Sequence, residues 1–304
     1  MARILDGAAI AAQIKQEVAE EVRALAAQGI RPGLAAVLVG NVAASEIYVR
    51  NKVRICGEVG ICSDLITRSE TVTTAELLEL VASLNARNEI DGILIQLPLP
   101  VQVDVKTVLD LILPAKDVDG LHPVNAGLLQ AGRTVLAPCT PAGVIEILKR
   151  SQIPISGQHA VVVGRSDLVG KPAAMLLLHQ NATVTICHSK TRDLGTITRQ
   201  ADILVAAIGR AGFITPEMVK PGATLIDVGI NRITERADFD RFFAGNAKRE
   251  ASFAKNGSTL VGDIDPKAFE VAGAYTPVPG GVGLLTTAML MANTVRAAKM
   301  RRGL

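Results

Sequence analysis

The chain has 304 residues, of which 49% are hydrophobic and 20% charged, and its formal net charge is only +3. Aromatic residues make up 3% of the sequence and tryptophan is absent, which argues against a nucleic-acid surface built from clustered basic residues and stacking rings. No signal-peptide pattern and no apolar run of about 18 residues occur, so we expect a cytoplasmic protein with no membrane partner. The length allows two ordinary domains.

Hydrophobic periodicity predicts alternating helices and strands in the first half of the chain. The N-terminus is typical of a short strand followed by an amphipathic helix at about 8–28. The expected strands that follow are 33–40, 63–67 and 91–99, and the expected helices are 45–59, 73–88 (beginning at a Thr73/Thr74 cap) and 103–112. Continuous apolar strands between helices indicate a parallel sheet covered on both faces.

The middle of the chain has a different character. Residues 113–140 are rich in turn formers and weakly periodic, and a loop of that length is usually functional or interdomain. Thr140 and Pro141 then supply a cap and a first-turn proline for a helix at 141–150.

The second half repeats the strand–helix pattern more cleanly. The expected strands are 159–164, 182–187, 203–208, 223–229 and about 259–262. Short buried strands in this arrangement predict a doubly wound, Rossmann-like nucleotide-binding domain. The last segment is expected to be a helix that packs back onto the first domain. The predicted fold is therefore α/β with two α/β domains, 1–139 plus 284–304 and 140–283.

Two groups of residues fit bland roles. The four cysteines show no CxxC pairing and the four histidines are scattered, so we expect free thiols in a reducing compartment and no metal site. The basic residues Lys299, Arg301 and Arg302 are most simply interpreted as a solvated helix end.

Lys52 lies where the apolar face of the 45–59 helix should be. At 100° per residue it falls among Tyr48, Val49, Ile55, Cys56 and Val59. Tyr48 is one turn away, so the two side chains can meet. A buried amine tends to lose its proton and then suits proton transfer, whereas a lysine that extends its ammonium into water is the structural alternative.

A glycine turn follows the strand at 159–164. Gly164, Arg165 and Ser166 precede Gly170 and a helix, which is the usual seat for a pyrophosphate. The next strand ends in Cys187-His188-Ser189-Lys190 without the acidic residue that would hold an NAD ribose. A basic, hydroxyl-rich pocket favours the 2′-phosphate of NADP, although a polar surface turn would look similar. Asp227 and Gly229 are expected at the same edge, near the nicotinamide.

Other polar residues are expected at the carboxyl ends of strands, where ligands bind to parallel sheets. Gln96 interrupts an apolar strand and either orients Lys52 or is a core amide bonded to the backbone. Asp117 and Asp119 could bind a metal, although flanking ligand spacing is absent. Asp119 could instead accept hydrogen bonds from an amidine-like heterocycle edge, or the two could form a solvated acidic turn.

The stretch TPVPGGVG (276–283) holds Pro277, Gly280 and Gly281. Such a stretch lets the backbone approach a ligand closely, and it also simply ends an element.

An ordered set of motifs resembles the bifunctional methylenetetrahydrofolate dehydrogenase/cyclohydrolase family. The set comprises YVRNK (48–52), GILIQLPLP (92–100), KDVDGLHPVN (116–125), PCTP (138–141), GRSDLVGKP (164–172), CHSKT (187–191), DVGIN (227–231), GD (262–263) and TPVPGGVG (276–283). YxxxK or the glycine turn alone is promiscuous, whereas the ordered set is highly specific.

The resemblance implies a homodimer whose subunits bind folate in a cleft between a catalytic domain and an NADP domain. It implies NADP-dependent oxidation of 5,10-methylenetetrahydrofolate and hydrolysis of the methenyl product to 10-formyltetrahydrofolate. Lys52 would be the general acid/base, with Tyr48 and Gln96 orienting it. Asp119, Pro277, Gly280 and Gly281 would contact folate. The residues implied to contact the cofactor are Gly164, Arg165, Ser166, Ser189 and Ile230.

The chain departs from the family pattern at two places. Leu284 stands where the family usually has proline after PVPGGVG, and the charged stretch 232–257 is longer than expected. The stretch is predicted to be a surface helical insertion.

Two alternatives remain open from the sequence, and a third is excluded. A dehydrogenase with little cyclohydrolase activity and a non-catalytic pyridine-nucleotide sensor are the alternatives to the bifunctional enzyme. The short-chain dehydrogenases also use YxxxK, but there the motif follows the nucleotide turn, whereas here it precedes it by more than 100 residues.

Overall fold

The computed structural model describes residues 2–41 and 43–304, with the side chains of 43 and 44 left aside. The chain forms two compact units, one of residues up to 10 with 140–286 and the other of 11–139 with 287–304. The predicted functional domains, 1–139 plus 284–304 and 140–283, stay predictions. At the N-terminus the compact units differ from the predicted domains. Arg3 and Ile4 pair with a strand of the unit that contains 140–286.

The unit of 11–139 and 287–304 is built on a parallel sheet with the strand order β3-β2-β4. Its strands are β2 (Gly33–Val39), β3 (Cys62–Arg68) and β4 (Gly92–Ile95). Its helical elements are α1 (Gly7–Ala26), α2 (Ala43–Val59), α3 (Thr74–Ala86), α4 (Val105–Asp110), η1 (Pro114–Lys116), α5 (Pro123–Gln130) and α11 (Val282–Met300). Helices α1 and α11 also supply residues to the other unit.

Strand β2 is buried along its whole length, as its apolar sequence predicts. Val37 packs in one cluster with Val81 of α3 and Val108 of α4. Helix α3 begins with the expected threonine cap: Glu76 N donates to Thr73 Oγ1 at 3.3 Å, and Thr73 N donates to Glu76 Oε2 at 2.7 Å. Reciprocal bonds of this kind satisfy donors that a helix start leaves free.

Three predicted boundaries differ from the structure. Strand β4 ends at Ile95 rather than 99, so Gln96 follows the strand. Helix α5 lies inside the expected loop; His122 caps it by accepting from Val124 N at 3.0 Å, with Pro123 in its first turn. Helix α6 (Cys139–Arg150) begins before Thr140, whose hydroxyl pairs with Thr286 Oγ1 at 2.9 Å instead of capping the helix.

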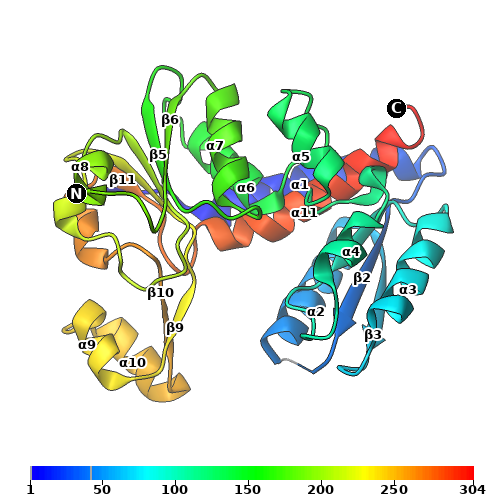
Figure 1. Cartoon of the computed structure of the whole chain (residues 1–304), viewed down its shortest axis with the longest axis horizontal. Coiled ribbons are helices and arrows are strands. Elements are labelled where there is room, and N and C mark those ends of the chain that lie inside the picture. Colours follow the sequence, from blue (N-terminus) through cyan, green and yellow to red (C-terminus); the bar gives the residue numbers. More distant parts are fainter. Residues whose placement is uncertain (1, 42) are drawn as a thin grey trace. The chain divides into compact units, whose positions relative to one another are not determined.

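The other unit contains a parallel sheet with the order β1-β11-β8-β7-β5-β6. Its strands β5, β6 and β11 are labelled in Figure 1. Its strands are β1 (Arg3–Ile4), β5 (His159–Val163), β6 (Thr183–Cys187), β7 (Ile203–Ala206), β8 (Thr224–Asp227) and β11 (Ala274–Tyr275). Its helical elements include α6, α7 (Gly170–His179), α8 (Leu194–Thr198), η2 (Pro216–Met218) and η3 (Pro266–Glu270). The doubly wound α/β prediction is confirmed for this unit.

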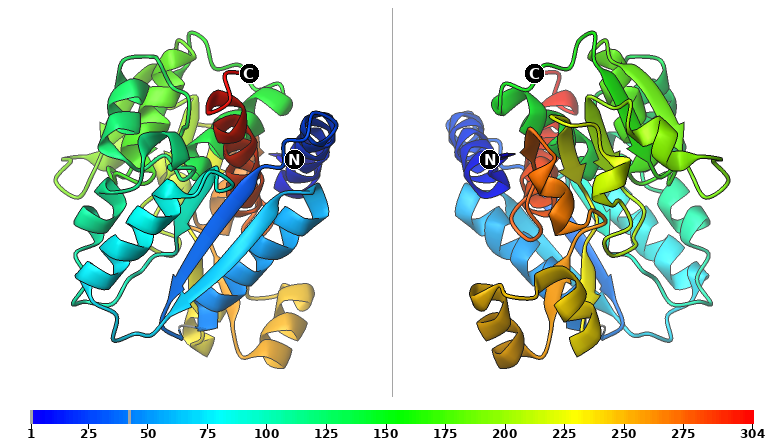
Figure 2. Two further views of the ribbon diagram at one scale, coloured as in Figure 1. Left: turned by 90° about the vertical axis from the view of Figure 1, so that its right-hand side faces the viewer. Right: turned by 90° about the vertical axis from the view of Figure 1, so that its left-hand side faces the viewer.

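The strand expected at about 259–262 is not part of that sheet. Strand β10 (Thr259–Val261) pairs antiparallel with β9 (Asn231–Ile233) in a separate ribbon. The charged stretch after β9 forms α9 (Arg236–Phe243) and α10 (Ala247–Asn256), so the helical prediction is confirmed. Figure 2 shows the two helices side by side at the end of the ribbon.

The interpretation of the C-terminal basic cluster as a solvated helix end is wrong for Arg301 and Arg302, whereas Lys299 makes an exposed ion pair with Glu21. Arg301 Nη1 and Arg302 Nη1 lie 2.5 and 2.7 Å from Asp91 Oδ1, and the Asp91 side chain is fully buried. The other carboxylate oxygen accepts from Gly33 N at 3.1 Å. A buried carboxylate needs such partners, so the two arginines hold the start of β2 through Asp91.

Replacing Asp91 with alanine removes the shared carboxylate of Arg301 and Arg302. We expect the free energy of unfolding to fall by about 3 kcal/mol, because removing one partner of a buried ion pair leaves the other uncompensated. Glu21→Ala, which breaks an exposed pair with Lys299, is the control and should cost under about 1 kcal/mol. Urea unfolding monitored by circular dichroism measures both, and equal losses would contradict the argument.

Candidate active site

Helix α2 presents Lys52 in the middle of its inward face. The buried positions Ser45, Val49, Cys56 and Val59 follow helical spacing, and Lys52 completes the stripe between them. Lys52 itself is half-buried rather than buried, so its amine stays accessible. Tyr48, expected on the same face, is 53% exposed and lies one turn before the lysine.

Gln96 binds Lys52 directly. Lys52 Nζ donates to Gln96 Oε1 at 3.0 Å, and Gln96 Nε2 donates to Leu97 O at 2.8 Å. Gln96 N also donates to Val37 O at 2.9 Å, which ties the residue to the end of β2. Because the amide nitrogen already faces a carbonyl, the amide oxygen must face the lysine. Of the two sequence interpretations, the one in which Gln96 orients Lys52 therefore agrees with this geometry.

Asp117 and Asp119 have different settings. Asp117 is 3% exposed and accepts from Leu121 N (3.1 Å), His122 N (2.8 Å) and Asn125 Nδ2 (2.7 Å), so it is not part of a solvated turn. A parallel bridge joins Asp117 to Ile93 of β4. Continuing that register places Asp119 beside the end of β4, next to Gln96.

The carboxyl group of Asp119 lies out of water near the charges of Lys52 and Asp117. Loss of hydration raises the pKa of this group, the charge of Asp117 adds to the rise, and the nearby Lys52 ammonium opposes it. Its side-chain contact is the Cys139 thiol, with Sγ 3.8 Å from Oδ1. Lys52, Gln96 and Asp119 are thus brought to one end of the sheet, as the sequence predicted.

Sequence reasoning missed Asn293, a buried residue of α11. Its amide nitrogen donates to Val118 O and Ala137 O, both at 2.8 Å, and lies 3.6 Å from Cys139 Sγ. Burial raises the pKa of Cys139 well above its ordinary value, so the sulfur remains a thiol. The amide holds the segments on either side of Asp119 together. The only sign of Asn293 in the sequence is its position as a polar residue in an apolar helix.

Lys116 was also missed, and its role is structural. It is 1% exposed, and Nζ donates to Leu84 O, Asn85 O and Arg87 O at 3.1, 2.9 and 2.6 Å. The ammonium thereby satisfies carbonyls at the C-terminal end of α3. Burial lowers the pKa of Lys116 to about 8.

The expected phosphate seat has the close packing that a glycine turn requires. Gly164 follows β5 with φ +134°, and a Cβ there would lie 2.2 Å from Ala207 O. A Cβ on Gly170, at the start of α7, would lie 2.3 Å from Gly164 O. Ser166 Oγ accepts from Val169 N and Gly170 N at 3.2 and 3.3 Å. Backbone N–H groups at such a helix start suit a pyrophosphate.

The residues expected to bind a 2′-phosphate follow neighbouring strands. Val163 of β5 pairs with Cys187 of β6, and Gly164 N donates to Cys187 O at 2.9 Å. Arg165 and Ser189 each stand two residues beyond that pair, and both are exposed. A cationic and a hydroxyl side chain thus leave adjacent strand ends, which fits a phosphate on the adenosine ribose of a dinucleotide.

Asp227 and Asp263 form a buried carboxylate pair that organises the loops at this edge. Asp227 accepts from Gly229 N (3.0 Å), Asp263 N (2.9 Å) and Ile264 N (2.9 Å). Asp263 accepts from Asn231 Nδ2 at 2.9 Å and from the N–H groups of residues 208–210 at 2.6–2.9 Å. Burial is the main cause that raises the pKa of Asp227 to about 7. Asp227 therefore holds the backbone of the loops that follow β8 and β10, and its expected place near the nicotinamide stays a prediction.

Close backbone approach also defines the TPVPGGVG segment. A Cβ on Gly281 would lie 2.6 Å from Pro277 O, and a Cβ on Gly7 would lie 2.3 Å from Gly281 O. Gly280 has φ +110°, a conformation that favours glycine. Ile230 is 48% exposed, and its Cδ1 would be 3.1 Å from a Cβ on Gly283. The segment thus presents backbone with limited side-chain bulk at Gly280 and Gly281, and Ile230 lies beside it at Gly283.

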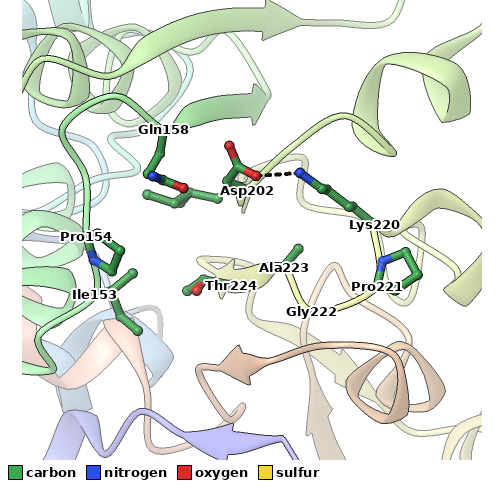
Figure 3. Close-up of a pocket in the computed structure, with 10 residues that line it drawn as sticks. Ile153, Pro154, Gln158, Asp202, Lys220, Pro221, Gly222, Ala223 and Thr224 are labelled. Carbon is green, nitrogen blue, oxygen red and sulfur yellow. Dashed lines mark hydrogen bonds and ion pairs between the residues drawn. The ribbon is translucent and has the colours of Figure 1, made fainter.

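A cavity lies at the amino-terminal edge of the sheet that contains β5, opposite the edge where the glycine turn follows that strand. This cavity of about 370 Å³ is lined by Gln158, Asp202, Lys220 and Thr224, among others (Figure 3). Lys220 Nζ pairs with Asp202 Oδ1 at 2.5 Å, and Asp202 Oδ2 accepts from His159 N at 2.9 Å. Because its charges neutralise each other, this cavity shows no group directed at a ligand.

The remaining site types can be reported briefly. Across residues 2–41 and 43–304 there is no group of His, Cys, Asp and Glu residues arranged to hold a metal ion. Within the same residues, no helix has the length and apolar character needed to cross a membrane. The cysteines Cys56, Cys62, Cys139 and Cys187 are free thiols.

Fold and site together are those of a pyridine-nucleotide-binding α/β protein in which Lys52 is hydrogen-bonded to Gln96. Residues 5–119 match the catalytic domain of tetrahydrofolate dehydrogenase/cyclohydrolase, and residues 138–302 match its NAD(P)-binding domain. The chain belongs to the tetrahydrofolate dehydrogenase/cyclohydrolase family.

Individual relatives cover the chain from end to end. The bifunctional protein FolD of Koribacter versatilis is 68% identical over 303 residues, covering 100% of this chain and 99% of the relative. The crystal structure of the bifunctional FolD dehydrogenase/cyclohydrolase from Campylobacter jejuni is 40% identical with a TM-score of 0.89, covering 99% of this chain and 100% of the other. The Trypanosoma brucei FolD structure, complexed with NADP and an inhibitor, is 36% identical with a TM-score of 0.89, covering 100% and 99%.

Gly262→Ala tests the buried carboxylate pair. The new Cβ would lie 1.8 Å from Asp227 Oδ2, so either the carboxylate or the backbone of β10 must move. We expect the free energy of unfolding to fall by at least about 2 kcal/mol, the scale of overpacking at a buried site. Gly127→Ala, where a Cβ meets nothing within 4 Å, is the control and should be neutral or stabilising. Thermal unfolding compares them, and a neutral Gly262→Ala would refute the tight packing.

Proposed function

We propose that this protein oxidises 5,10-methylenetetrahydrofolate with NADP and hydrolyses the resulting 5,10-methenyltetrahydrofolate to 10-formyltetrahydrofolate. The observation that carries the proposal is the hydrogen bond from Lys52 to Gln96 with the Asp119 carboxylate alongside. Membership of the tetrahydrofolate dehydrogenase/cyclohydrolase family over both of its domains supports both activities. The Campylobacter jejuni structure, which matches 99% of this chain, is of a protein named bifunctional methylenetetrahydrofolate dehydrogenase/cyclohydrolase.

In the hydrolysis, Lys52 acts as the general base and then as the acid. Its amine takes a proton from the water that attacks the methenyl carbon, and its ammonium returns that proton to the folate N5 as the bond from the carbon to N5 breaks. The hydroxyl now on the carbon loses its proton to water and becomes the formyl oxygen. Gln96 fixes the direction of the lysine through Oε1. Tyr48, exposed one turn away on α2, orients the lysine and borders the folate. Asp119 accepts hydrogen bonds from the pterin edge, because its carboxylate keeps free acceptor positions.

In the oxidation, NADP held at the glycine turn would supply the acceptor for the hydride of the methylene carbon. The chain's own contribution is to hold the two reactants, which accelerates a bimolecular step without chemistry by the protein. Lys52 positions the folate for this step as well. Gly164, Arg165, Ser166 and Ser189 bind the phosphates, and Ile230 supports the nicotinamide side. Pro277, Gly280 and Gly281 form the folate-contacting backbone. The separate roles imply that losing Lys52 affects the two activities differently.

Two further properties belong to the same proposal. We infer a homodimer acting in the cytoplasm, supported by the family resemblance and by free cysteine thiols, which persist in a reducing compartment.

The assay that tests the function records NADPH and methenyltetrahydrofolate during oxidation, and then the decay of supplied methenyltetrahydrofolate without nucleotide. Oxidation without accelerated decay would leave a dehydrogenase alone, whereas NADP binding without either activity would indicate a sensor.

Lys52→Met separates the two chemistries. We expect the cyclohydrolase kcat to fall at least about 100-fold, the usual contribution of a general acid/base, while NADP affinity stays within about twofold. Lys106→Met, on an exposed position of α4, is the matched control and should leave both activities unchanged. Hydrolysis that persists in the Lys52→Met protein would refute the role of the lysine.

The double substitution of Arg165 and Ser189 by alanine tests the cofactor choice. Losing charge-assisted bonds to a 2′-phosphate should raise the KM for NADP about 30-fold. The KM for NAD, which lacks that phosphate, serves as the internal control and should change less than about threefold by the same argument. Steady-state dehydrogenase kinetics with each nucleotide measure the pair. Parallel rises for NADP and NAD would exclude a 2′-phosphate site here.

A further inference from the structure

The α9–α10 insertion is a packed structure with its own small core. Phe239, Phe242 and Phe243 are at most 7% exposed and pack with Ile233 and Val261 of the ribbon. The ring centroids of Phe239 and Phe253 are 4.6 Å apart, which joins the two helices. The prediction of a surface helical insertion is therefore correct for the helices, while their aromatic face is buried.

The insertion is also fixed to the loop after β7. A Cβ on Gly212, whose φ is +56°, would lie 2.1 Å from Cε1 of Phe242. Arg236 forms ion pairs with Asp240 of α9 and Glu250 of α10. The two helices thus have a defined position relative to the nucleotide-binding sheet of the same unit.

Arg249 connects this insertion to the TPVPGGVG segment. Its Nη2 donates to Val278 O at 2.6 Å, while Nη1 donates to Thr259 Oγ1 and Leu260 O, both at 3.2 Å. Its Cζ lies 4.6 Å from the ring centroid of Phe243. These contacts hold the half-buried guanidinium in place, and the bond to Val278 is charge-assisted.

The segment needs such a contact between its two anchored ends. At one end Thr276 N donates to Leu225 O at 3.0 Å and Asp227 N donates to Thr276 Oγ1 at 2.8 Å; at the other end α11 begins at Val282. A cavity of about 460 Å³ lies beside the stretch between them, lined by Phe243, Arg249, Pro277 and Val278, among others. Arg249 therefore spans a place where the segment lacks close packing.

We propose that Arg249 is a positioning residue that holds residues 276–283 in the conformation that contacts folate. The charged insertion then serves to carry Arg249, and it acts on the reaction through the backbone of Val278. The inference rests on the proposed folate-binding role of Pro277, Gly280 and Gly281.

The test uses the full-length protein with Arg249→Met and Arg249→Lys. Methionine keeps the length of the side chain but removes every hydrogen bond, and lysine keeps one cationic donor for Val278 O. We expect the KM for methylenetetrahydrofolate to rise about tenfold in the Met variant and about threefold in the Lys variant, the scale of one charge-assisted bond. The KM for NADP should change less than about twofold in both, because the phosphate seat on α7 is untouched.

Arg241→Met is the matched control. Arg241 lies on α9 with Cζ 4.8 Å from the Phe242 ring, so its loss removes a comparable ring contact within the same insertion. Its folate KM should match that of the wild type. Hydrogen exchange provides the second measurement: the amides of 276–283 should exchange faster in both Arg249 variants, with those of 223–227 unchanged, even if the Met variant is too unstable for kinetics.

The outcomes separate this inference from the proposed function. An active wild type with unchanged folate KM and unchanged exchange in the Arg249 variants would overturn the positioning role alone. A lower melting temperature without a folate KM change would do the same, because it would show a purely structural arginine. A wild type that turns over no folate would overturn the proposed function, and this inference with it.

Discussion

A carboxylate buried away from water needs hydrogen-bond donors, and this requirement shapes the backbone in the functional regions of the chain. Asp117 gathers the N–H groups that shape the turn leading into α5. Asp227 and Asp263 gather those that follow β7, β8 and β10. Each carboxylate is buried, and each fixes backbone rather than binding a ligand. The carboxylate left with few partners is Asp119, which is the one we assign to folate.

The orientation of Lys52 also depends on which hydrogen-bond donors and acceptors are already paired. Gln96 can orient Lys52 because its amide nitrogen is already engaged by Leu97 O, which leaves the oxygen with a single direction. The half-buried setting keeps the amine within reach of water while holding it against a fixed partner. A general base needs both properties, since the proton it takes must come from a water placed in line with the substrate.

Local patterns in the sequence predicted much of this arrangement. Apolar periodicity predicted the parallel strands, and the threonine cap marked the start of α3. Lys52 stood out because a charge interrupted an apolar stripe, and Gln96 because an amide followed an apolar run. These signals are local, so a single segment is enough to read them.

What the sequence did not predict depends on contacts between distant segments. Arg301 and Arg302 looked solvated because Asp91 lies about 210 positions earlier in the chain. The β9–β10 ribbon is held by pairing across a long insertion, so the segment at 259–262 resembled one more parallel strand. Asn293 and Arg249 donate hydrogen bonds to backbone carbonyl groups of other segments. Because every residue has a carbonyl group, no sequence pattern shows which one is the partner.

The discontinuity of the two units has a consequence for dissecting the molecule. A fragment beginning at 140 would lack β1, leaving β11 as an unprotected sheet edge, and edges of that kind invite pairing with other chains. A fragment ending at 139 would lack the arginines that neutralise Asp91. We therefore expect that neither the fragment ending at 139 nor the fragment beginning at 140 would be a self-contained folding unit. During synthesis on the ribosome, Asp91 would lack these two partners until residues 301 and 302 had been added.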